Sequence, residues 1–190
     1  MTTQTFEYCS LHYLNLWLTH DSRYCKALSS SNEDKKLSAL KEAGGFYRVA
    51  RNLPSEFDER KGKKRYQPVL EILDSINSEQ FKDNLVKEIL EIEKRISKQY
   101  GNRGVLSLTT KFLWLKTKRP ILIYDSQARI AIGTKDGDLA GYYQKWREDF
   151  EKYQPKIKEA CTQLSNLHLY AVDQDLGTKI YRASCKTLRI

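Results

Sequence analysis

One acidic residue, Asp125, lies where a carboxylate can take part in chemistry. It follows the short apolar run Ile121–Ile123 and precedes a stretch with helical character that begins at Ser126. An acid between a buried connector and a helix N-terminus is poorly hydrated and close to the positive end of a helix dipole. The same position suits an ordinary N-cap residue. The sequence therefore predicts that Asp125 caps a helix and is also a candidate catalytic group.

The segment before Asp125 is predicted to form another helix, which has to position the site. Its apolar body is the stretch 112–115, and Pro120 forces Arg119 out of helical geometry, so the helix should end in the basic turn 116–120. The helix is expected to begin at hydroxyl residues that can cap its N-terminus, namely Ser107, Thr109 and Thr110.

The turn at Gly101–Gly104 and the basic side chains around it predict an interaction with phosphate. A tight turn that leads into a helix exposes backbone N–H groups, which bind anions. Within residues 101–132, six basic residues stand against one acid, a net charge of +5. The residues predicted to contact a nucleic-acid backbone are Arg103, Ser107, Thr109, Thr110, Lys116, Lys118, Arg119 and Arg129.

The order of these features resembles the helix-hairpin-helix DNA glycosylases. Residues 100–132 contain, in this order, a hairpin, a lysine, an apolar helix, a basic turn with a proline, an apolar run and an Asp-Ser pair. The chain is most similar to the compact bacterial branch that has an 8-oxoguanine glycosylase fold. The resemblance implies that Asp125 is the catalytic carboxylate. It also implies that Lys111 matches the lysine that forms a Schiff base in members that cut the strand as well.

This resemblance implies hydrolysis of the N-glycosidic bond of a base flipped out of double-stranded DNA, with no cofactor. The interval from Lys111 to Asp125 is shorter than in most members, which favours a monofunctional enzyme whose lysine contacts a phosphate or the pocket. Trp114 and Tyr124 flank the site and are candidates for base stacking, although core packing is the commoner role of such residues.

Several alternatives stay open at this level. The substrate could be 8-oxoguanine, an alkylated base, or a hypermodified base of phage DNA removed as a defence. The chain could instead be a non-enzymatic helical DNA-binding module that uses the same hairpin and basic residues. A third interpretation is a helical protein-interaction subunit whose charge is incidental. A DNA affinity that falls with salt would argue against this interpretation.

The composition of the chain limits which partners, which cell compartment and which cysteine chemistry can be expected. The 190 residues carry 33 Lys and Arg against 24 Asp and Glu, a net charge of +9, which favours a polyanionic partner. No long apolar run or N-terminal signal pattern is present, so we expect a cytoplasmic protein without a membrane span. The cysteines do not form close pairs, and neither a metal site nor a disulfide framework is expected; they are Cys9, Cys25, Cys161 and Cys185.

The apolar periodicity predicts an all-α fold, one compact helical domain over residues 1–190, with space for two lobes around a cleft. A helix that is apolar on nearly all sides, and therefore buried, is expected over 5–19. Further helices are expected over 33–43 (stopped by Gly44 and Gly45), 67–76, 79–100 (capped by Ser78), from 138 onward with a kink or restart at Pro155, and from 177 to the C-terminus. The basic run 58–65 is a second candidate phosphate contact.

Overall fold

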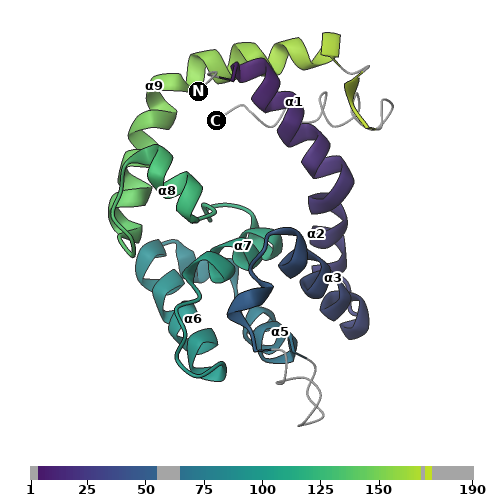
Figure 1. The fold of residues 1–190 in the computed structure, drawn as a ribbon, viewed down its shortest axis with the longest axis vertical. Helices are drawn as coiled ribbons and strands as arrows, with labels where there is room; N and C mark the ends of the chain where they lie inside the picture. The colour runs from purple at the N-terminus through teal and green to yellow at the C-terminus, as the bar shows by residue number, and fades with distance from the viewer. Residues whose placement is uncertain (1–3, 55–64, 168–169, 173–190) are drawn as a thin grey trace. The chain divides into compact units, whose positions relative to one another are not determined.

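The computed structural model describes residues 4–54, 65–167 and 170–172. In these residues the fold is helical and contains no strand, as predicted (Figure 1). No helix among the described residues is long and apolar enough to cross a membrane. The chain divides into two units, Met1–Arg23 with Arg147–Ile190, and Tyr24–Trp146. Two of the predicted features, the basic run up to residue 64 and the helix from 177, lie outside the described residues.

The unit Tyr24–Trp146 contains every residue that the sequence predicts for the site. Its elements follow in the order α2 (Ser22–Leu28), α3 (Glu33–Phe46), the 3-10 turn η2 (Ala50–Asn52), α5 (Gln67–Asp74), the 3-10 turn η3 (Ser78–Phe81), α6 (Leu85–Gln99), α7 (Leu106–Thr117), α8 (Ser126–Ile132) and the beginning of α9 (Leu139–Leu167).

Helix α7 lies within the core of this unit, against α5 and α6 (Figure 1). Every residue from Leu108 to Leu113 is buried, including two threonines and a lysine. Apolar side chains such as Phe112 and Leu113 are fully enclosed, which supplies the driving force for packing. Polar groups in such a place need partners in the protein, because burial removes them from water. The partners of the buried polar side chains of α7 must therefore be other groups of the protein and not water.

Helix α3 does not stop at the two glycines, so that prediction is wrong. The helix continues through Gly44 and Gly45 to Phe46. A Cβ atom at residue 44 would collide with the ring of Tyr66, whereas one at residue 45 would meet nothing within 4 Å. Gly44 is therefore explained by close packing against Tyr66, and not by a helix end.

The predicted helix over 79–100 is divided in the structure. Asn77 caps the short turn η3, accepting from the backbone N–H of Glu79 at 3.0 Å while its own N–H donates to Gln80 Oε1 at 3.2 Å. Asn84 then has φ −146° and ψ 68°, which is not helical, and α6 begins at Leu85. The cap expected at Ser78 thus belongs to Asn77.

The starts of two predicted helices agree closely with the structure. Helix α5 begins at Gln67 with Pro68 in its first turn, where a missing N–H is harmless. Helix α3 begins after Asn32, whose side chain accepts from Lys35 N at 2.8 Å.

In the other unit, α1 (Phe6–Leu16) is not buried on all sides as predicted. Leu14 is its buried residue, whereas the side chains of Tyr8 and Tyr13 are 53% and 69% exposed. Tyrosine combines an apolar ring with a polar hydroxyl, so a count of aromatic residues overstates burial. Helix α9 is continuous through Pro155 and does not restart there.

Candidate functional site

Lys111 and Asp125 form an ion pair in the unit Tyr24–Trp146. The Lys111 Nζ atom lies 3.1 Å from Asp125 Oδ2, and it donates to Ser107 Oγ at 3.1 Å. The Lys111 side chain is 7% exposed, whereas the Asp125 side chain is 31% exposed. The lysine is therefore enclosed by protein, and the carboxylate is the member of the pair that reaches solvent.

Asp125 is also the N-cap of α8. Its Oδ1 atom accepts a hydrogen bond from Ala128 N at 2.9 Å, and its backbone is extended. The two carboxylate oxygens thus have different partners, the helix N-terminus for Oδ1 and Lys111 for Oδ2. This arrangement fixes the orientation of the carboxylate, and it confirms that Asp125 caps a helix.

The connector before Asp125 is held by side chains instead of by a neighbouring strand. Leu122 N donates to Tyr143 Oη at 2.7 Å, and Tyr142 Oη donates to Ile123 O at 2.8 Å. Tyr124 N donates to Thr110 Oγ1 at 3.1 Å. Burial raises the pKa of Tyr143 to about 12, so its hydroxyl remains protonated at neutral pH. These bonds place Asp125 beside α7.

A cavity of about 630 Å³ has the ion pair in its wall. This volume falls within the range of about 300–1,000 Å³ that is common for ligand pockets. The residues that line it are Tyr47, Arg48, Val49, Arg51, Asn52, Gly104, Leu106, Ser107, Lys111, Tyr124, Asp125, Ser126, Gln127, Asp136 and Gly137.

The carboxyl group of Asp125 is held in its ionised form. Burial raises its pKa, but the hydrogen bonds from Ala128 N–H and from the Lys111 ammonium outweigh burial, so the pKa lies below its ordinary value. A fixed carboxylate that is partly exposed to a cavity can stabilise a positive charge that develops on a bound molecule. It can also orient a water molecule for attack.

The structure brings four of the predicted site residues together at this cavity: Ser107, Lys111, Tyr124 and Asp125. Tyr124 is 4% exposed, and its hydroxyl accepts from Gly137 N at 2.8 Å. Its ring packs edge-on against Tyr142, with the centroids 5.1 Å apart. Trp114, the other aromatic residue predicted for the pocket, is not among the lining residues. The aromatic residue beside the ion pair is instead Tyr47, whose ring centroid lies 5.9 Å from Lys111 Nζ.

The predicted roles of Thr109 and Thr110 are contradicted by their burial. Helix α7 begins at Leu106 after Val105, without a side-chain cap, so both threonines lie inside the helix. Both are fully buried, and a phosphate cannot reach them. Ser107 also lies within the first turn of α7, but it is half-buried and lines the cavity.

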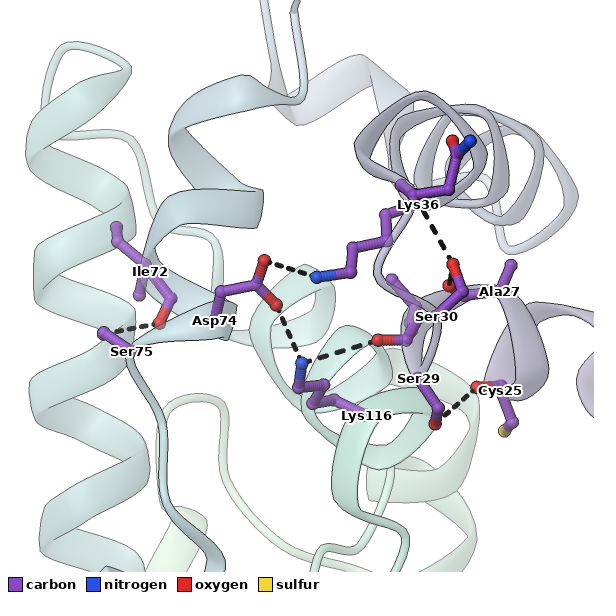
Figure 2. Close-up of polar contacts among 11 residues, drawn as sticks. Cys25, Ala27, Ser29, Ser30, Lys36, Ile72, Asp74, Ser75 and Lys116 are labelled. Atoms are coloured by element: carbon purple, nitrogen blue, oxygen red, sulfur yellow. Dashed lines mark hydrogen bonds and ion pairs between the residues drawn. The ribbon is translucent and has the colours of Figure 1, made fainter.

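Lys116 is engaged by an acidic residue of α5 (Figure 2). Its Nζ lies 2.8 Å from Asp74 Oδ1, and Lys36 Nζ lies 2.8 Å from the other oxygen of the same carboxylate. Burial raises the pKa of Asp74, but the two ammonium groups outweigh it and the pKa is lowered. Lys116 therefore has a structural partner at the position for which the sequence predicts a phosphate.

The remaining predicted phosphate contacts are not brought into the cavity lining. Arg103, Lys118 and Arg119 are exposed. Arg129 Nε lies 3.5 Å from Asp136 Oδ1, and its guanidinium donates to Thr134 O at 3.2 Å. Arg129 thus contacts Asp136, which lines the cavity, but does not line the cavity itself.

The sequence interpretation missed the residues that follow α3. Tyr47, Arg48, Arg51 and Asn52 all line the cavity, although they are far from Lys111 in the chain. A signal was present, since two arginines and a tyrosine lie between a helix and Pro54, but no spacing rule connects them with residues 107–125.

Comparison with family models, with curated proteins and with solved structures finds no match for this chain. Among the residues described, no group of three or more His, Cys, Asp or Glu side chains is placed to hold a metal ion. The features that indicate a function are therefore the geometry of the cavity and the sequence pattern of residues 100–132.

Proposed function

We propose that this protein is a DNA glycosylase that hydrolyses the N-glycosidic bond of a flipped damaged or modified base. The observation that carries the proposal is the 3.1 Å contact between Lys111 Nζ and Asp125 Oδ2 in the wall of a cavity of about 630 Å³. These are the two positions to which the glycosylase resemblance assigns the chemistry. Their meeting at a cavity is what such an enzyme requires, because the target base must leave the duplex to be reached.

Asp125 would act on the sugar of the flipped nucleotide. As the bond to the base breaks, positive charge develops on the sugar ring, and an ionised carboxylate nearby stabilises it. The lowered pKa of Asp125 supports this role, because it keeps the group charged at neutral pH. The same carboxylate can orient the attacking water molecule.

Lys111 would position Asp125 in a monofunctional enzyme. Its Nζ is shared between Asp125 and Ser107, and the side chain is 7% exposed. A lysine that attacks a sugar carbon must be accessible and must have a free electron pair. An enclosed nitrogen that donates to a carboxylate is suited to orient that carboxylate. These contacts favour base hydrolysis without strand cleavage.

The test is base release from a panel of double-stranded DNA: genomic, oxidised, alkylated, and phage DNA with modified cytosines. Abasic sites are detected with an aldehyde-reactive probe. Asp125→Asn should abolish them while DNA binding persists, because asparagine keeps the helix cap and removes the charge. Asp83→Asn is the control, since Asp83 is exposed on the turn before α6 and does not line the cavity. The DNA that responds distinguishes repair of damaged bases from defence against phage.

A borohydride trap decides the role of Lys111. Borohydride reduces a Schiff base to a stable protein–DNA adduct, so a monofunctional enzyme should release base without forming one. An adduct that disappears in Lys111→Gln would show a bifunctional enzyme. If no DNA yields abasic sites and salt-dependent binding remains, the chain is a DNA-binding module and the glycosylase proposal fails.

A further inference from the structure

The segment after α3 forms a fixed wall of the cavity. Tyr47 N donates to Ala43 O at 2.8 Å, and Val49 N donates to Gly44 O at 2.9 Å. Arg48 lies between them with φ 56°, in the left-handed region, and Val49 is buried. A non-glycine residue in this conformation costs free energy, so the surrounding contacts must determine it.

The far end of this segment is fixed by another arginine. The guanidinium of Arg65 donates to Ala50 O at 2.5 Å and also to Leu53 O. These two carbonyls flank Arg51 and Asn52, which line the cavity. The backbone of the wall is therefore anchored at both ends, and the side chains of Arg48 and Arg51 project from a preorganised support.

Among the residues that the structure describes, the charge balance of the cavity provides Arg48 and Arg51 with no counter-ion. Both acidic residues that line it already face a cation: Asp125 lies 3.1 Å from Lys111, and Asp136 lies 3.5 Å from Arg129. In the described part of the chain, the guanidinium groups of Arg48 and Arg51 form neither an ion pair nor a hydrogen bond with a side chain. Both residues are exposed at the cavity, where they can meet an anionic ligand.

We propose that Arg48 and Arg51 bind the DNA phosphates that flank the nucleotide in the cavity. Guanidinium groups donate two parallel hydrogen bonds to a phosphate, which fixes its position as well as its charge. A phosphate held at this wall places its sugar between the arginines and the Lys111–Asp125 pair, since all four side chains line one cavity. This assignment rests on the proposed function. It moves the main phosphate contact from the basic turn after α7 to the segment after α3.

The experiment measures binding of a duplex that contains one tetrahydrofuran abasic-site analogue, which cannot be hydrolysed. Affinity is measured by fluorescence anisotropy between about 50 and 200 mM salt for wild type, Arg48→Gln, Arg51→Gln and the double variant. The comparison variant is Arg119→Gln, which removes the same charge from an exposed residue that does not line the cavity and that the sequence predicts to contact phosphate. Thermal unfolding of each variant verifies that it is folded.

Arg48→Gln and Arg51→Gln should each weaken binding about tenfold, with a small change for Arg119→Gln. The double variant should reduce the slope of log affinity against log salt by about 2, because each phosphate contact contributes about 0.9. Equal losses in all three single variants, or a loss in Arg119→Gln alone, would overturn the assignment. Arginine-dependent binding without abasic-site formation on any DNA would retain this assignment and remove the glycosylase proposal.

Discussion

Thr110 and Tyr124 are hydrogen-bonded through one hydroxyl group. Thr110 Oγ1 accepts from Tyr124 N at 3.1 Å, and its single proton lies between two acceptors, Tyr124 O and Ser107 O, each 3.3 Å from Oγ1. The next residue along each segment completes the site, because Lys111 follows Thr110 and Asp125 follows Tyr124. The threonine thus sets the register between α7 and the connector, and the register brings the lysine and the aspartate together.

Replacement of this hydroxyl should therefore destabilise the protein and disturb the site. In Thr110→Val the shape is kept, but the buried N–H of Tyr124 loses its partner, which costs about 1–3 kcal/mol. Thr109→Val is the matched control, because the Thr109 hydroxyl is fully buried and has no hydrogen-bond partner in the described structure. That change should be neutral or stabilising. Urea denaturation of both variants measures the difference, and equal stabilities would refute the role of Thr110.

The ion pair predicts a specific pH dependence. The folded-state pKa of Asp125 is lowered, so its contribution to the free energy of unfolding is complete above the ordinary carboxyl pKa. It is lost as the pH falls through the folded-state value. The stability difference between wild type and Asp125→Asn should be constant from about pH 5 to 7 and should shrink below about pH 4.

Other carboxyl groups, such as Asp74, titrate in both proteins and cancel in this difference. Chemical denaturation at a series of pH values measures it. A difference that stays the same at the lowest pH would mean that the charge of Asp125 contributes no stability, and that the substitution acts through packing or capping alone.

The sequence was most informative where a local rule decides the structure. The beginnings of the helices at 33 and 67, and the place of Asp125 between an apolar run and a helix, were predicted from neighbouring residues alone. These features depend on backbone groups within one turn of the residue, so the sequence contains the whole cause. The resemblance named Lys111 and Asp125 as site residues but predicted no contact between them, and the 3.1 Å ion pair is seen only in the fold.

The predictions that failed depended on contacts between distant segments. The hydroxyls of Thr109 and Thr110 suggested a helix N-terminus, but the core placed them inside α7. The division between η3 and α6 was invisible because Asp83 and Asn84 do not disturb the apolar period of the helix. The cavity wall at Arg48 was missed because nothing local relates it to Lys111.

The glycine pair of α3 allows a direct comparison of two identical substitutions. Gly44→Ala places a Cβ atom against the ring of Tyr66, with Tyr66 Cε1 at 3.1 Å, and this ring is buried against Phe112. The crowding should destabilise the protein by about 1–3 kcal/mol. Gly45→Ala meets no atom within 4 Å and should stabilise it by about 0.4–1 kcal/mol, because alanine restricts the unfolded chain. Melting temperatures of the two variants should move in opposite directions, and a shared direction would contradict this account.

The ion pairs of Asp74 with Lys116 and Lys36 predict that Lys116 supports the fold and does not bind DNA (Figure 2). Lys116→Gln should lower the free energy of unfolding by about 0.5–1 kcal/mol, because the pair with Asp74 is partly exposed to solvent. Affinity for the abasic-analogue duplex should stay within twofold of wild type.

Lys36→Gln is the matched substitution, since Lys36 pairs with the other oxygen of the same carboxylate. In an Asp74→Asn background both lysine substitutions should lose most of their effect on stability, which denaturation of the double variants measures. Weaker DNA binding with unchanged stability in Lys116→Gln would instead restore the phosphate contact that the sequence predicts.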